Sequence, residues 1–279
     1  MCREEFRLRN FKFWHPEHRE FTDSRWLSLP VFIAYRLIVT VYNLAWLFYN
    51  IHVSGVKLFI FLTNWTYLIL NIYFVYATTL SCIALYRDNK KSRETDPVVE
   101  IEMGPGDDHG GSSTQYGATD LETADRKKDG LRFQHKLLWL IYVISATGGL
   151  WITVGYWSIL IEDAPIDANN ITKHALNSVF MLIDTCLSSI PVQLFHFLYV
   201  LLYFLIYIAF SVFYWLLGGT NNKGQPYIYR LLNYSEFKAT TGVLLAVFLL
   251  LVLPVLHLVF FGITKLRDYI YRKRVNGMK

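Results

Sequence analysis

From Ala175 to Leu217 the chain is almost continuously apolar over about 43 residues. A helix needs only about 20 residues to cross a hydrocarbon core about 30 Å thick, because it rises about 1.5 Å per residue. A run of this length therefore predicts two helices. We place the turn between them near Pro191, Gln193 and His196, where a proline and two polar side chains interrupt the run.

Composition and hydropathy together place the chain in one class. The composition is 53% apolar, 17% aromatic and only 18% charged, which indicates a membrane protein with several spans. The predicted fold class is all-α, a polytopic transmembrane helix bundle of about six spans. The segments long enough to cross are 29–49, 58–86, 137–161, 175–195, 197–217 and 240–264.

Lysine and arginine are distributed unequally between the two sides of these spans. Six precede residue 29, nine lie between 87 and 136, and six follow residue 264, whereas the alternate connections hold only five: Lys57, Lys173, Lys223, Arg230 and Lys238. Positive residues favour the cytosolic side, so we expect both termini in the cytosol. The predicted organisation is a cytosolic segment (1–28), a membrane domain (29–264) interrupted by a disordered cytosolic loop (88–129), and a basic cytosolic tail (265–279).

Two glycosylation sequons fall in the connections that this topology places outside. They are Asn170-Ile-Thr172 and Asn233-Tyr-Ser235. Asn170 and Asn233 are therefore candidate glycosylation sites, and their position agrees with the charge distribution.

Asp184 lies in the middle of the fourth predicted span. An ionised group costs at least a few kcal/mol within a membrane, so it needs a partner or a function. At about 1.5 Å per residue, Arg36 and His257 lie at similar depths, close enough for a long side chain to bridge to Asp184. We predict an intramembrane polar cluster of Asp184, Arg36, His257 and Asn177. It either fixes the helix register or relays protons in a transporter.

Thr63 and His174 enter neighbouring predicted spans from the outer side. A threonine hydroxyl beside a histidine base is a potential nucleophile, because the imidazole can accept the proton as the oxygen attacks an ester carbonyl. Both residues have structural alternatives: membrane threonines commonly bond to backbone carbonyls, and a histidine at a span boundary commonly faces interfacial water. Thr63 and His174 are the candidate catalytic residues.

Three stretches resemble the rolling stone family. They are Leu62-Thr-Asn-Trp-Thr-Tyr-Leu68, the run from His174 through Asp184 to Pro191, and Phe210-Ser-Val-Phe-Tyr-Trp-Leu-Leu-Gly-Gly219. The resemblance implies a multi-pass membrane protein associated with myoblast fusion during muscle formation.

A more distant resemblance links the chain to the androgen-induced family of membrane threonine hydrolases, which cleave fatty-acid esters. Lys57-Leu-Phe-Ile-Phe-Leu-Thr63 is similar to the region of the catalytic threonine, and Ala175-Leu-Asn177 to the start of the histidine motif. The position matching the catalytic histidine is Met181, which cannot accept a proton. His174 lies seven residues earlier, about 10 Å away along a helix.

The sequence patterns and the two resemblances leave two classes of function. One is a non-enzymatic membrane protein of cell–cell fusion. The other is an intramembrane hydrolase of lipid esters that uses Thr63 and His174. Expected partners are membrane lipids, with membrane-protein partners or a homo-oligomer as further possibilities, and no nucleic acid. No cofactor or metal is implied. The plasma membrane is the expected location, with the endoplasmic reticulum as the alternative.

Overall fold

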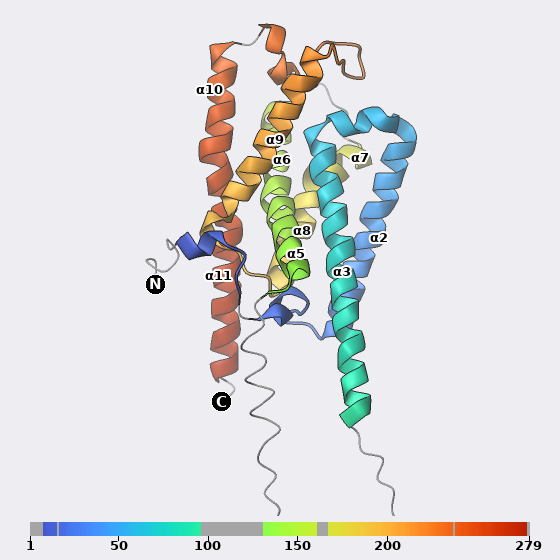
Figure 1. Ribbon diagram of the computed structural model, residues 1–279, viewed down its shortest axis with the longest axis vertical. Coiled ribbons are helices and arrows are strands. Elements are labelled where there is room, and N and C mark those ends of the chain that lie inside the picture. The colour runs from blue at the N-terminus through green and yellow to red at the C-terminus, as the bar shows by residue number, and fades with distance from the viewer. Residues whose placement is uncertain (1–7, 16, 96–130, 161–166, 237, 278–279) are drawn as a thin grey trace, which may run out of the picture.

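The computed structural model describes residues 8–15, 17–95, 131–160, 167–236 and 238–277. These residues form a bundle of six long helices whose direction alternates along the chain (Figure 1). The helices are α2 (Leu29–Ser54), α3 (Leu62–Thr95), α5 (Phe133–Val143) continued by η4 (Ile144–Gly148), α6 (Gly149–Gly155) and η5 (Tyr156–Leu160), α7 (Ala168–Ile171) continued by η7 (Thr172–Leu176) and α8 (Asn177–Leu187), α9 (Phe197–Leu216), and α10 (Ala239–Val247) continued by η11 (Phe248–Val252) and α11 (Leu253–Gly277). Short 3₁₀ helices are η1 (Leu8–Phe11), η2 (His18–Phe21), η3 (Gly55–Ile60), η8 (Leu194–His196), η9 (Arg230–Leu232) and η10 (Tyr234–Glu236).

Five of the six long helices are long and apolar enough to cross a membrane. They lie in the ranges Leu29–Ile60, Leu62–Glu94, Phe133–Ile159, Leu194–Leu216 and Ala239–Gly277. The remaining helix, Ala168–Leu187, is about 30 Å long at 1.5 Å per residue but carries Lys173, His174, Asn177 and Asp184. Its polar side chains are covered by the other helices. The all-α polytopic bundle predicted from hydropathy is confirmed.

An even number of helices brings the start of α2 and the end of α11 to the same end of the bundle, at the bottom of Figure 1. We call this the inner end and the opposite one the outer end. Among the described residues, the connections at the outer end are η3 and the residues between α9 and α10.

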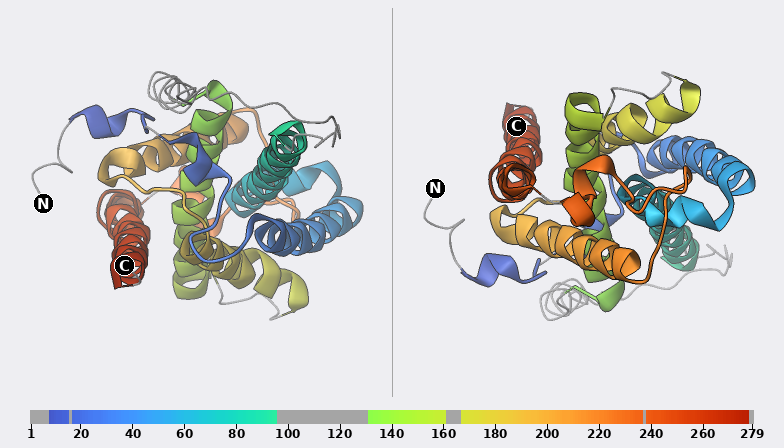
Figure 2. Two further views of the ribbon diagram at one scale, coloured as in Figure 1. Left: turned by 90° about the horizontal axis from the view of Figure 1, so that it is seen from below. Right: turned by 90° about the horizontal axis from the view of Figure 1, so that it is seen from above.

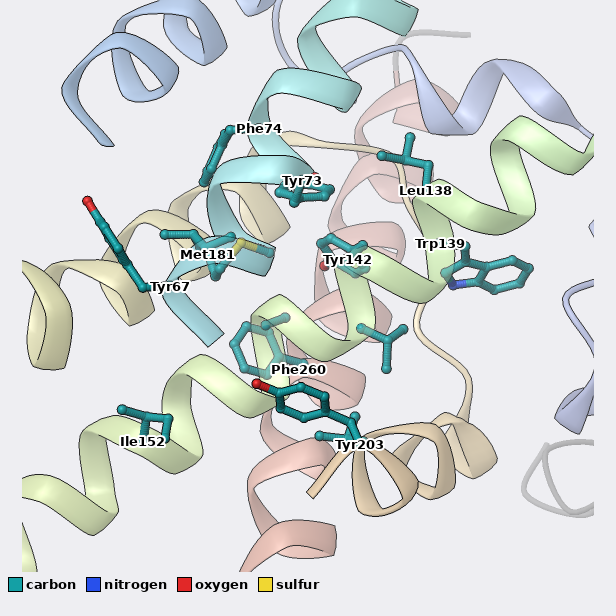
Figure 3. Close-up of a cluster of buried hydrophobic side chains, with 14 of the residues drawn as sticks. Tyr67, Tyr73, Phe74, Leu138, Trp139, Tyr142, Ile152, Met181, Tyr203 and Phe260 are labelled. Carbon is teal, nitrogen blue, oxygen red and sulfur yellow. The ribbon is translucent and has the colours of Figure 1, made fainter. Parts of the chain in front are cut away.

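The continuous helix α5–η4–α6–η5 lies at the centre of the bundle, with the other helices around it (Figure 2). In the most apolar stretch of this helix, 56% of the residues are buried inside the bundle. The corresponding share for α10–α11, at the periphery, is 22%. Aromatic side chains fill the space around it, including Tyr73, Trp139 and Tyr142 (Figure 3). Their polar atoms are hydrogen-bonded: Tyr142 Oη lies 2.8 Å from Thr185 Oγ1, and Trp139 Nε1 donates to Pro191 O at 2.7 Å. Such bonds hold helices together where lipid removes the hydrophobic contribution.

Three of the long helices contain π-helical stretches: η4 and η5 lie in the central helix, η7 precedes α8, and η11 precedes α11. A π-helical turn inserts an extra residue into an α-helix and is frequent at functional sites. Here η5 and η7 both lie at the outer end of the bundle.

The turn from α2 into η3 depends on Gly55. Its φ of 60° lies in the left-handed region, where a Cβ atom is unfavourable. Gly55 N donates to Ile51 O and so ends α2.

The fourth helix begins and ends earlier than the predicted 175–195. It starts at Ala168 and stops at Leu187, and an extended segment then leads to η8. Two features of the inner end stop it. The N-terminal segment pairs with it, since Arg25 N donates to Leu187 O and Ser189 N donates to Asp23 O, both at 3.1 Å. In addition, Arg267 of α11 donates hydrogen bonds to backbone carbonyls on both sides of Leu187.

Arg267 is buried and donates to four backbone carbonyls of the fourth helix and its extension. Its Nη1 lies 2.9 Å from Thr185 O and 2.7 Å from Ser188 O, and its Nη2 lies 3.3 Å from Ser189 O and 3.2 Å from Ile190 O. Thr185 O belongs to the last turn of α8, whose carbonyls have no partners within the helix, and the other three carbonyls lie in the extension beyond Leu187. A residue predicted to belong to the cytosolic tail therefore helps to hold the inner end together.

α3 extends to Thr95, so residues 88–95 of the predicted disordered loop are helical. The extension is tied down by an ion pair between Arg19 Nη2 and Asp88 Oδ2 at 2.7 Å and carries a Lys90–Glu94 pair one turn apart. The rest of the predicted loop, residues 96–129, lies outside the described residues.

Candidate functional site

Arg36 and Asp184 meet in the centre of the bundle. Arg36 Nε lies 3.1 Å from Asp184 Oδ1, and Arg36 Nη2 lies 3.3 Å from Asp184 Oδ2. Tyr73 Oη donates to Asp184 Oδ2 at 2.5 Å, and Arg36 Nη1 donates to Ser81 Oγ at 3.2 Å. The guanidinium also stacks on Phe32, with 4.1 Å to the ring centroid. Both charged side chains are 0% exposed, so this cluster joins α2, α3 and α8 without offering an approach to a substrate.

His257 does not join that cluster. Its Nδ1 lies 2.9 Å from Thr147 Oγ1 and its Nε2 lies 2.9 Å from Gln193 O. Because a carbonyl can only accept, Nε2 carries the proton and Nδ1 accepts from the threonine. His257 has a suitable depth but the wrong helical face: α11 directs it to the central helix and the segment before α9.

Asn177 also stands apart from Asp184. Its Oδ1 accepts from Thr153 Oγ1 at 3.1 Å and from Ser178 N at 2.6 Å. It lies about two turns nearer the outer end, seven residues before Asp184. The predicted four-residue cluster is therefore corrected to Arg36 and Asp184 with Tyr73 and Ser81.

A second feature is a cavity of about 1180 Å³ at the outer end, which we call the outer chamber. Its walls come from the η3–α3 turn, from η5 and η7, and from the connection between α9 and α10. Thr63 and His174 both line it. The remaining wall is mostly polar or aromatic and includes Asn64, Tyr156, Lys173, Asn221, Gln225, Tyr227, Tyr229, Arg230, Asn233 and Glu236.

His174 is held firmly in this wall. Its ring stacks on Tyr156 with centroids 3.5 Å apart and planes 9° from parallel, and its backbone carbonyl accepts from Trp157 Nε1 at 3.0 Å. The side chain is only 7% exposed, and among the described residues its Nδ1 has no hydrogen-bond partner. Buried polar atoms are nearly always paired, so an unpaired nitrogen at this position is unusual.

Thr63 is the second residue of α3 and is 8% exposed. No hydrogen bond joins it to His174 within the described residues. Thr63 hydrogen-bonds to Tyr229, whose pKa is raised by burial and lowered in part by this hydrogen bond. The tyrosine hydroxyl therefore stays protonated near neutral pH and can donate a hydrogen bond beside Thr63.

A smaller cavity of about 80 Å³, the apolar pocket, adjoins the chamber. It lies between α6, α9 and α10, where Trp151, Phe204 and Phe248 form part of its lining. Thr63, Tyr156, Tyr229 and Leu231 line both cavities.

The two sequon asparagines lie at the outer end. Asn170 follows the α7 N-cap, where its backbone N donates to Asp167 Oδ1 at 2.7 Å. Asn233 lines the outer chamber, and its Nδ2 lies 3.4 Å from Glu236 Oε2. Both side chains are half-buried. Met181, by contrast, is fully buried in the core and lines neither cavity.

Sequence reasoning missed several residues of this site. Tyr156 lies in a span that carried no motif. Tyr229 belongs to Tyr227-Ile-Tyr229, which resembles the rolling stone family, but that resemblance assigned it no role in a site. The described residues contain no group of three or more His, Cys, Asp or Glu side chains that could hold a metal ion.

Comparison with known proteins places these elements in a family. The family model described as Protein rolling stone matches residues 118–276. Protein rolling stone of Drosophila melanogaster is 28% identical over 136 residues, which are 47% of this chain and 49% of that protein. The chain thus matches about half the length of that relative, and no solved structure matches it. The family match covers more than half of the chain and includes four of the six long helices. His174 and Asp184 both lie within the matched residues. The chain belongs to the rolling stone family.

Proposed function

We propose that this protein acts in the plasma membrane in fusion between cells, as in the formation of muscle fibres from myoblasts, and that it does so without catalysis. The observation that carries the proposal is its membership of the rolling stone family. The buried Arg36–Asp184 pair agrees with a non-catalytic role, because both of these intramembrane charges are engaged in contacts between helices.

The experiment is depletion and re-expression in fusion-competent myoblasts. Depletion is expected to reduce mixing of cytoplasmic dyes between cells, and the wild-type chain is expected to restore it. Thr63→Val, which keeps the side-chain shape and removes the hydroxyl, is expected to restore mixing equally well. Normal mixing after complete depletion would contradict the fusion role. Surface biotinylation of the same cells tests the plasma-membrane location.

The outer chamber favours a second candidate function, hydrolysis of lipid esters within the membrane. Thr63 and His174 line the same cavity, and His174 Nδ1 has no other partner. In such a reaction His174 accepts the proton of Thr63, directly or through one water, as the threonine oxygen attacks the ester carbonyl. The alcohol leaves with that proton, and water then releases the acid from the acyl-threonine. In this proposal Tyr229, which hydrogen-bonds to Thr63, donates to the developing oxyanion.

A fluorophosphonate probe tests this second function. Labelling of the wild type that is lost in Thr63→Val, retained in Thr63→Ser and reduced in His174→Gln would support a threonine nucleophile. Thr66→Val is the matched control, since Thr66 is one turn further along α3 and bonds to Leu62 O and Tyr203 Oη outside the chamber. An unlabelled wild type, or labelling unchanged in Thr63→Val, would remove this candidate.

A further inference from the structure

Two cavities of opposite character share one wall at the outer end of the bundle. The outer chamber is large and polar, the apolar pocket is small and hydrocarbon-lined, and four residues face both. We propose that together they bind an anionic single-chain amphiphile. Its headgroup occupies the outer chamber and the first part of its chain enters the apolar pocket. This binding requires neither fusion activity nor ester hydrolysis.

The outer chamber suits an anionic headgroup. Its described lining contains four basic side chains and one acidic one: Lys173, Lys223, Arg230 and Lys238, against Glu236. Charge-assisted hydrogen bonds from lysine and arginine are the strong contacts by which proteins hold carboxylates and phosphates. Lys173 is the basic residue nearest to His174 in the chain and is already oriented, since its Nζ donates to Asn50 Oδ1 at 3.2 Å.

His174 gives the chamber a specific polar anchor. The side chain is more than nine-tenths buried, it is fixed against Tyr156, and its Nδ1 lacks a hydrogen-bond partner in the described part of the chain. An atom of this kind is costly to leave unpaired, so a hydroxyl or protonated group of a ligand would stabilise it.

The apolar pocket suits hydrocarbon. Trp151 packs on Phe204 and on Phe248 with ring centroids 4.4 Å and 5.7 Å apart, and leucines of α10 complete the lining. Its volume of about 80 Å³ equals the liquid volume of about three waters, at roughly 30 Å³ each, so it holds only a few methylene groups. The remainder of a longer chain would lie outside the pocket.

The shared wall places polar atoms where the two parts of such a ligand join. Three hydroxyl-bearing side chains, Thr63, Tyr156 and Tyr229, belong to the lining of both cavities. A carboxylate or a phosphate ester at the head of a chain would meet these hydroxyls as it passes from one cavity to the other. Carboxylate and phosphate share this chemistry, and the experiment separates them.

The test is photocrosslinking on the full chain in nanodiscs of phosphatidylcholine. The probe is a palmitic acid analogue with a diazirine near its carboxylate and a terminal alkyne. We expect crosslinks in segments 204–208 or 244–249, and at least tenfold stronger competition by palmitate or by lysophosphatidic acid than by palmityl alcohol. Stronger competition by palmitate assigns a free fatty acid, and stronger competition by lysophosphatidic acid assigns a phosphate headgroup.

Variants locate the site. Leu245→Trp fills the apolar pocket, and Lys173→Gln with Arg230→Gln removes two charges of the chamber. Each is expected to reduce crosslinking at least fivefold. Leu250→Trp and Lys57→Gln are matched controls, since Leu250 is exposed on the same helix and Lys57 lies at the outer end outside the chamber.

Three outcomes on the wild-type protein would overturn the proposal: equal competition by palmityl alcohol, crosslinks confined to exposed lipid-facing positions, or no crosslink at all. Unchanged labelling of a folded Leu245→Trp protein would do the same. Thr63→Val should keep the crosslink, so a failed hydrolase test leaves this binding test intact.

Discussion

Asp184→Ala should destabilise the bundle strongly, because it leaves a buried arginine charge without its counter-ion. Arg36 is 0% exposed and cannot reach water, and its remaining partners would be the hydroxyls of Tyr73 and Ser81. The substitution also removes the acceptor of Tyr73. Breaking a buried ion pair by removing one partner costs about 3–5 kcal/mol.

That cost is a large share of the 5–15 kcal/mol by which native proteins are typically stable. In a chain of this size, each kcal/mol of lost stability lowers Tm by about 2–4 °C, so we expect Asp184→Ala to lower Tm by roughly 6–20 °C. Removing both charges should cost less, since a hydrophobic pair can replace an ion pair at little loss. The order expected for Tm is wild type, then Arg36→Met with Asp184→Leu, then Asp184→Ala.

The assay is thermal unfolding of the purified protein in detergent, followed by tryptophan fluorescence, together with surface delivery in cells. Asp184→Asn separates charge from shape, and Asp268→Ala is a control for loss of a partly exposed carboxylate at the inner end. A Tm for Asp184→Ala within about 2 °C of wild type, or a double variant less stable than Asp184→Ala, would refute the reasoning.

Three other predictions follow from the fold. Arg267→Gln should lower stability by at least about 1.5–3 kcal/mol, the contribution of one charged hydrogen bond, because four buried carbonyls lose their charged donor. Thermal unfolding measures it, with the exposed Arg272→Gln as control, and equal Tm values for the two variants would contradict it. Gly55→Ala should cost about 1 kcal/mol through its positive φ, measured in the same way, whereas an unchanged Tm would show that the turn relaxes. Epitope tags at both ends should be reached by antibody only after permeabilisation, and a tag between Lys223 and Gly224 without it; the reverse pattern would invert the topology.

The sequence predicted the bundle well because hydropathy acts over whole segments. Boundaries were harder: the helix ends at Leu187, whose carbonyl accepts from Ser24 Oγ and Arg25 N, and these residues precede it by more than 160 positions. Depth along the membrane normal brought Arg36, Asp184 and His257 to one level, but depth leaves the helical face undetermined. His257 therefore met Thr147 instead, because α11 packs with that face against the central helix.

The outer chamber was harder to anticipate for a related reason. Thr63 and His174 could be named from their chemistry and their entry from the same side. Tyr229 comes from a connection whose path follows from tertiary packing, and the stacking of Tyr156 on His174 depends on π-helical turns in two different helices. Neither leaves a pattern in the sequence that periodicity could detect.

The Arg36–Asp184 pair also bears on how the chain is assembled as it is synthesised. The two residues are 148 positions apart, so α2 enters the membrane carrying a charge whose counter-ion has not yet been made. Tyr73 and Ser81 lie on the next helix, and their hydroxyl oxygens each accept a hydrogen bond from the guanidinium at 3.2 Å. The α2–α3 hairpin thus shelters Arg36 with hydroxyl groups during translation, and the arrival of α8 completes its neutralisation.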